Sequence, residues 1–120
     1  MITITMNTKK LQLTVEGHAQ PEESSEFRQI CAAASALAQG LAYSVARMTG
    51  EEDGQSYRAF EYKNDPGDLK LRIFPEVWPA GEIRQRFLNY SDGMECLAKS
   101  HPQSVRMIRD GALILPEKGV

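Results

Sequence analysis

The stretch "VEGHAQPEESSEFRQICAAASALAQG", from Val15 to Gly40, decides how this chain folds. It begins at the end of an alternating apolar run, passes through a polar segment that contains Pro21, and enters an alanine-rich segment. It also carries chemistry, because His18 closes the first part and Cys31 lies near the start of the last part. The question is whether these two residues form a catalytic pair or are only neighbours in the sequence.

Two short alternating runs at the start of the chain predict a β-hairpin. The first run is "ITITM", residues 2 to 6, which is rich in β-branched side chains. In the second run Leu11, Leu13 and Val15 alternate with polar residues, and "NTKK" between the runs has the composition of a turn. Each run therefore predicts a strand with one buried face.

A long helix is predicted from about Phe27 to Met48. Ser24 or Ser25 is a candidate N-cap, and Thr49-Gly50 ends the pattern. The apolar residues recur at helical spacing: Ile30, Leu37, Leu41, Val45 and Met48. The small residues in the middle of this helix predict close approach to a sheet or to a partner helix.

The second half of the chain repeats this organisation. "SYRAFEYK" and "LKLRIF" bracket the turn-forming "NDPGD" and predict a second hairpin. A second helix is predicted from about Gly81 to Lys99, with His101-Pro102 ending it, and "SVRMI" predicts a last strand before a weakly specified tail. The order ββαββαβ predicts an α/β (α+β) fold, in which two helices pack on one mixed or antiparallel sheet within a single domain, residues 1–120.

Composition excludes several classes of function. The net charge is −2, which disfavours direct binding of nucleic acid or of an anionic membrane surface. The two cysteines form no Cys-x-x-Cys motif, and neither a signal peptide nor an apolar run long enough for a membrane span is found. We therefore expect a cytoplasmic protein with no membrane partner, no cofactor and no metal site. Cys96 is expected in the core.

His18 and Cys31 have the residue types of a cysteine protease. A thiol becomes a good nucleophile only as a thiolate, and the start of a helix favours the thiolate and offers N–H groups to an oxyanion. His18, at the end of a strand, would act as general base and then as general acid. The spacing alone favours the simpler alternative, in which Cys31 packs as a small apolar residue and His18 is a polar loop residue.

The literal motif is more specific than the spacing. Gly17-His18-Ala19, a short polar segment and then "ICAAASALAQGL" resemble the ribosomal-processing cysteine protease (Prp) family. The resemblance implies a small α/β domain, often a homodimer, with a catalytic dyad of His18 and Cys31. It also implies that Gly17 and Ser35 line the substrate site. Its expected partner is a peptide substrate, the N-terminal extension of a large-subunit ribosomal protein or of a phage protein.

One segment departs from the family pattern. The family usually has Gly-x-Asp before its Ile/Val-Ile/Val-Cys, whereas this chain has Glu26-Phe27-Arg28. Arg28 would stabilise a thiolate at Cys31 and contact substrate, but it cannot orient His18 as a carboxylate would. Glu22, Glu23 or Glu26 are alternatives for that role. Two other hypotheses stay open: a paralogue that binds a protein partner without cutting it, and a purely structural dimer module.

Overall fold

The computed structural model describes residues 1–17, 24–50, 60–65, 67–74 and 80–115. The elements follow in the order β1 (Ile2–Asn7), β2 (Gln12–Glu16), α1 (Ser25–Thr49), β3 (Phe60–Asp65), β4 (Asp68–Ile73), α2 (Ala80–Ser100), β5 (Val105–Arg109) and β6 (Ala112–Leu113). The predicted α+β fold is confirmed. The short strand β6 is an addition, because sequence analysis assigned those residues to the tail.

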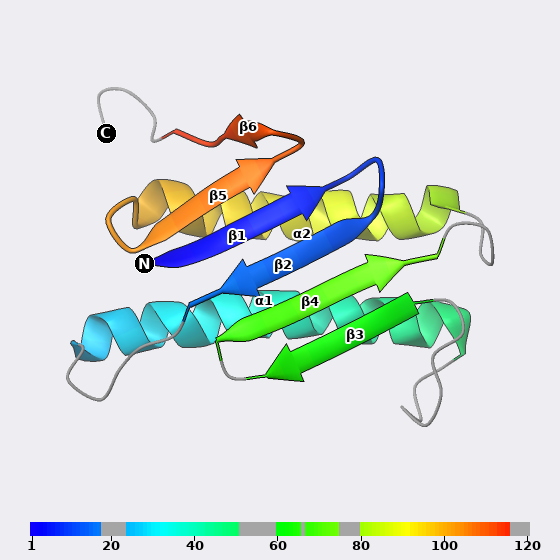
Figure 1. The fold of residues 1–120 in the computed structure, drawn as a ribbon, viewed down its shortest axis with the longest axis horizontal. Coiled ribbons are helices and arrows are strands. Elements are labelled where there is room, and N and C mark those ends of the chain that lie inside the picture. The colour runs from blue at the N-terminus through cyan, green and yellow to red at the C-terminus, as the bar shows by residue number, and fades with distance from the viewer. Residues whose placement is uncertain (18–23, 51–59, 66, 75–79, 116–120) are drawn as a thin grey trace.

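The strands form one mixed sheet in the order β3-β4-β2-β1-β5-β6. Strands β1 and β5 pair in parallel, and every other pair is antiparallel. Helices α1 and α2 run antiparallel to each other on the same face of the sheet, as Figure 1 shows. The fold therefore has two layers, with α1 behind the β2–β4–β3 side and α2 behind the β1–β5 side.

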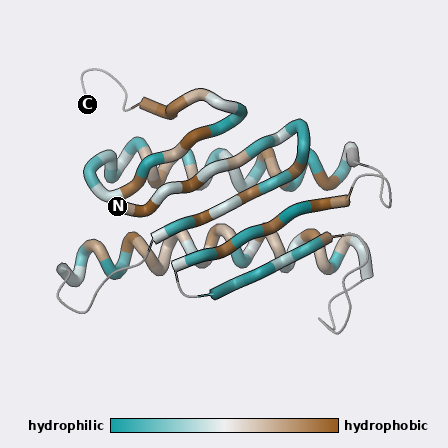
Figure 2. The backbone as a smooth tube through the Cα atoms, in the orientation of Figure 1, coloured by the Kyte–Doolittle hydropathy of each residue, from teal (hydrophilic) through white to brown (hydrophobic). Residues whose placement is uncertain are grey.

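The core lies between the sheet and the helices. Strand residues of one parity are buried against the helices, for example Leu69, Leu71 and Ile73 on β4, while Lys70 and Arg72 between them are exposed. Figure 2 shows this alternation of hydropathy along the strand. The alternation predicted for the first hairpin is confirmed in the same way, because a strand turns successive side chains to opposite faces.

Helix α1 has a defined cap at each end. The Ser24 hydroxyl accepts a hydrogen bond from the backbone N–H of Phe27 at 3.1 Å, which identifies Ser24 as the N-cap. At the other end Gly50 adopts a left-handed conformation, with φ 73°, and its N–H reaches the carbonyls of Ala46 and Arg47. The helix begins two residues earlier than predicted.

The small residues of α1 serve both of the predicted purposes. Ala34, Ala38 and Ala42 are buried in the core. Gly40 faces the neighbouring helix, where a Cβ in its place would lie 2.9 Å from the Tyr90 ring. Gly93 of α2 faces α1 in the same way, because a Cβ in its place would lie 3.1 Å from the Leu37 side chain. Glycine thus lets the two helices approach at two points.

Two details of the sequence prediction were wrong. Strands β3 and β4 continue in register as far as Asp65 opposite Asp68, so Asn64 and Asp65 belong to the strand rather than to the turn. Cys96 is exposed rather than buried. It lies two residues from the buried Met94, and a step of two residues on a helix turns a side chain to roughly the opposite side.

Candidate active site

A groove of about 330 Å³ lies beside the N-terminal half of α1. The helix lines it with Cys31, Ser35 and Gln39. These residues recur every four positions, so they share one face of the helix. The groove therefore holds a thiol, a hydroxyl and an amide in one row.

Strand β2 ends at this groove, where Val15 and Gly17 line it. Gly17 has φ 101°, and a Cβ in its place would lie 2.6 Å from the carbonyl oxygen of Met1. Its N–H donates a hydrogen bond of 2.9 Å to the carbonyl of Gly67 in the β3–β4 turn. The position accepts only glycine without strain, and the hydrogen bond fixes where the chain leaves β2.

The β3–β4 hairpin completes the groove. Asn64 at the end of β3 and Leu69 at the start of β4 lie opposite each other in the strand register, and both line the groove. Asp65 at the end of β3, Asp68 at the start of β4 and Gly67 in the turn between them also line it. The wall that faces Cys31 across the groove is therefore largely polar.

The structure brings together three of the five site residues proposed from the sequence. Cys31 and Ser35, both partly buried, and Gly17 line one groove. Arg28 is exposed and is not among the lining residues. His18, together with the alternative carboxylates Glu22 and Glu23, lies outside the described residues.

Cys31 lies deeper in the helix than the sequence suggested. Helix α1 begins at Ser25, so Cys31 belongs to its second turn. The free N–H groups of a helix belong to its first four residues, and the effect of the helix dipole fades within the first turn. The start of the helix is therefore not the source of oxyanion donors at Cys31, and other groups must supply them.

Sequence reasoning missed four polar residues of the groove, Gln39, Asn64, Asp65 and Asp68. Gln39 continues the spacing of Cys31 and Ser35, so the helical repeat could have identified it. Asn64 had no local signal, because it was assigned to a turn and the order of the strands in the sheet was unknown. Gln39 and Asn64 both carry an amide that donates hydrogen bonds.

The described part of the chain contains no group of three or more His, Cys, Asp or Glu residues arranged to hold a metal ion. Neither of the helices, as far as they are described, is long and apolar enough to cross a membrane.

No protein-family model and no curated protein matches this chain. Solved structures do. The S. aureus ribosomal processing protease Prp with a covalently linked product peptide has a TM-score of 0.67 and 16% identity, over 91% of this chain and 99% of that chain. The same protease with a substrate peptide has a TM-score of 0.64 and 17% identity, over 90% and 96%.

The protein SMU.848 from Streptococcus mutans is similar to the same degree, with a TM-score of 0.64 and 18% identity over 90% of each chain. The fold class is therefore a small two-layer α+β domain in which six strands carry two helices on one face. Within that class, this chain has the fold of the Prp structures, and the resemblance inferred from the sequence is confirmed at the level of fold.

Proposed function

We propose that this protein is a cysteine endopeptidase in which Cys31 is the nucleophile and His18 the general base. The observation that carries the proposal is the groove, which Cys31 and Gly17 both line. His18 is the next residue in the sequence after Gly17. The chain therefore leaves strand β2 at the groove that the thiol lines, which supports His18 as the partner of Cys31 in a dyad.

The reaction follows from these positions. His18 takes the proton of the Cys31 thiol, and the thiolate attacks a peptide carbonyl of the substrate. The imidazolium then gives its proton to the leaving amine, and an acyl-enzyme on Cys31 remains. Water, activated by the neutral imidazole, hydrolyses the acyl-enzyme and frees the thiol.

The oxyanion of the tetrahedral intermediate needs hydrogen-bond donors. We assign this role to the neutral donors of the groove, the Ser35 hydroxyl and the amides of Gln39 and Asn64, because the helix N–H groups near Cys31 are already paired within α1. Such donors contribute most when they are held in place before the reaction. Ser35 follows Cys31 by four residues, so their side chains are neighbours on one face of the helix.

Arg28 acts through its charge. It lies three residues before Cys31 on the helix, so the two positions are neighbours on the helix surface. A positive charge there favours the thiolate. The guanidinium is exposed rather than lining the groove, so it leaves room for a substrate chain.

The substrate we propose is the N-terminal extension of a large-subunit ribosomal protein, or a similar extension on a phage protein. The support is the likeness of fold to the S. aureus ribosomal processing protease, which was solved with a substrate peptide. The same resemblance implies one catalytic domain over residues 1–120 that works as a homodimer in the cytoplasm. Sedimentation of the purified chain tests the dimer, and a mass of one 13.4 kDa chain at working concentration would contradict it.

The competing function is a paralogue that binds such an extension without cutting it. It is motivated by Glu26-Phe27-Arg28, which departs from the Gly-x-Asp of the family pattern. An Arg28 side chain that filled the groove would favour it. The exposed position of Arg28 does not provide that observation. The hypothesis of a purely structural dimer module gains no specific support either.

A cleavage assay tests the proposal. Peptides that copy the N-terminal extension of the host's ribosomal protein, and of neighbouring phage proteins, would be incubated with the wild type and with Cys31→Ala. Cleavage by the wild type that is lost in Cys31→Ala supports the endopeptidase. Binding of the peptides by both proteins without cleavage by either would replace it with the binding paralogue.

A further inference from the structure

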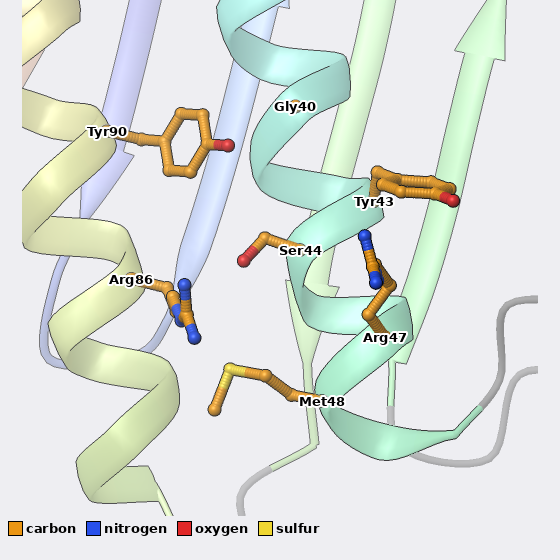
Figure 3. Close-up of a pocket in the computed structure, with 7 residues that line it drawn as sticks. All are labelled: Gly40, Tyr43, Ser44, Arg47, Met48, Arg86 and Tyr90. Carbon is orange, nitrogen blue, oxygen red and sulfur yellow. The ribbon is translucent and has the colours of Figure 1, made fainter.

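A second groove, of about 490 Å³, lies between the two helices on the side away from the sheet. Helix α1 lines it with the stripe Gly40, Tyr43, Ser44, Arg47 and Met48, and α2 adds Arg86 and Tyr90. Figure 3 shows Arg86 and Tyr90 pointing from α2 toward α1, while Ser44 and Met48 point back from α1. The volume is within the range of about 300–1,000 Å³ that small-molecule pockets have.

The charged residues that line this groove are all basic. Two guanidinium groups, from Arg47 and Arg86, line it, and no acidic residue does so in the described part of the chain. Neither guanidinium lies in an ion pair with a described carboxylate. Figure 3 shows Arg47 beside the Tyr43 ring and Arg86 reaching from α2 toward α1. Because two like charges line one groove, an anion bound in it would lower the free energy of the arrangement.

Hydrogen-bond donors are available beside these charges. Neither the Ser44 nor the Tyr90 hydroxyl makes a hydrogen bond to a described residue, and both side chains are partly buried. Arg47 lies over the Tyr43 ring, with 5.7 Å between its guanidinium carbon and the ring centroid, which orients its planar donor fork. A tetrahedral anion such as phosphate takes up donors from several directions, and arginine binds it through paired N–H groups.

We propose that the groove between α1 and α2 is a binding site for the phosphate group of a small phosphorylated ligand, held by Arg47, Arg86, Ser44 and Tyr90. Tyr43, whose ring is 57% exposed, offers a flat surface at the edge of the site for an aromatic part of that ligand. The net charge of −2 on the whole chain disfavours a long polyanion, so the ligand is a small molecule rather than RNA.

The site is separate from the proposed catalytic groove. Cys31 and Ser44 are thirteen residues apart on α1, which corresponds to roughly 20 Å along the helix axis. The two grooves also lie on different sides of that helix, one facing the β3–β4 hairpin and the other facing α2. The proposal therefore does not depend on the protease function.

Titration of the full chain with three probes tests the proposal: inorganic phosphate, adenosine monophosphate and adenosine. Amide NMR signals report both the affinity and the place of binding. We expect the two phosphate-bearing probes to shift signals of residues 40–48 and 86–90, and adenosine to shift none of them. The affinity should fall steeply with added salt, because exposed charges are screened.

Arg86→Gln is expected to weaken phosphate binding by about tenfold or more, since it removes a charge-assisted hydrogen-bond donor. Arg86→Lys, which keeps the charge without the planar fork, should fall between the wild type and Arg86→Gln. Arg106→Gln is the matched control, because Arg106 is an exposed arginine on β5, far from this groove in sequence and outside its lining. It should leave the affinity within a factor of about two.

Three results would overturn the proposal. One is the absence of saturable shifts with millimolar phosphate in a well-folded wild type. The second is binding that Arg86→Gln and Arg106→Gln weaken equally, which would show diffuse attraction to surface charge. The third is binding of a short RNA when neither phosphate nor the mononucleotide binds.

Discussion

Helix α1 lines two grooves of very different chemistry. Its N-terminal half presents Cys31, Ser35 and Gln39 to the β3–β4 hairpin, which adds the Asn64 amide and the carboxylates of Asp65 and Asp68 to the lining. Its C-terminal half presents Ser44 and Met48 to α2, and Arg47 of α1 and Arg86 of α2 make the lining cationic. The comparison teaches that one helix can line two grooves of different chemistry, because each face of the helix packs against a different element.

The largest expected effect concerns the nucleophile proposed for the first groove. Cys31→Ala should lower peptide cleavage by at least about a thousandfold, because removing a nucleophile costs nearly all of the rate acceleration. Cys96→Ala removes the other thiol, which is exposed on α2 and lines neither groove, and should leave cleavage unchanged. Single-turnover assays of both variants, with circular dichroism to show that each is folded, measure this. Equal cleavage activity in the wild type and Cys31→Ala would contradict the proposal that Cys31 is the nucleophile.

The next effect concerns Gly17, the glycine that lines the proposed catalytic groove. Gly17→Ala places a Cβ 2.6 Å from the Met1 carbonyl oxygen at a positive φ, so we expect it to lower the free energy of unfolding by about 1–3 kcal/mol or more. Cleavage should fall as well, since the exit of the chain from β2 must move. Urea denaturation and the peptide assay measure the two effects.

Gly111→Ala is the control for this variant. Gly111 also has a positive φ, 83°, but nothing lies within 4 Å of a Cβ built there. It should show only the cost of the left-handed backbone, about 1–2 kcal/mol, with cleavage intact once folded. A Gly17→Ala variant that is no less stable than Gly111→Ala would contradict the close approach of β2 to the N-terminus.

A smaller effect tests the contact between the helices beside the cationic groove. Gly81→Ala meets nothing within 4 Å, so alanine should stabilise the protein by up to about 1 kcal/mol through its better helix propensity. Gly40→Ala has the same intrinsic gain but forces the Tyr90 ring to move. We expect little or no net stabilisation from it, and altered signals of Tyr90 in NMR spectra. Equal stabilisation by both substitutions would show that the helices are not in close contact at Gly40.

The smallest effect comes from a carboxylate remote from both grooves. The Thr8 hydroxyl donates to Asp110 at 2.6 Å and the Thr8 N–H at 2.7 Å, and these hydrogen bonds lower the pKa of the Asp110 carboxyl. A lowered pKa in the folded state means that this stabilisation is present above the unfolded pKa of about 3.9 and is lost as pH falls through the folded value.

Asp110→Asn should therefore reduce stability slightly at neutral pH and make no difference in strong acid. Urea denaturation of this variant and the wild type at several pH values measures the effect, and the cleavage assay should not change. A difference that grows toward low pH would contradict the assigned hydrogen bonds.

The fold was largely predictable because its elements carry strong local patterns. Both helices and five strands followed from periodicity, and Ser24, Gly50 and His101-Pro102 marked the helix ends. What could not be predicted was long-range: the parallel pairing of β1 with β5 and the place of β3 at the sheet edge. Strand β6 is two residues long and exposed, so it has no apolar alternation to reveal it.

The residues of the candidate sites also divide into those that local sequence patterns reveal and those that only long-range packing brings together. Cys31 and Ser35 were accessible to sequence reasoning because helical spacing and the family motif both mark them, and Gly17 because it joins a strand to a polar segment. Asn64 required knowledge of which strand packs beside α1. Arg47 and Arg86 come from different helices, so only the antiparallel packing of α1 on α2 brings them into one groove.

The most direct test of the account compares the two cysteines. Cys31 is partly buried and Cys96 is exposed, so access alone would make Cys96 the more reactive thiol. The rates at which iodoacetamide modifies each residue at neutral pH can be followed separately by mass spectrometry. If the groove activates its thiol, Cys31 reacts faster than Cys96, and His18→Ala slows Cys31 alone. Faster reaction of Cys96, with Cys31 indifferent to His18→Ala, would contradict the claim that Cys31 is the nucleophile of a protease.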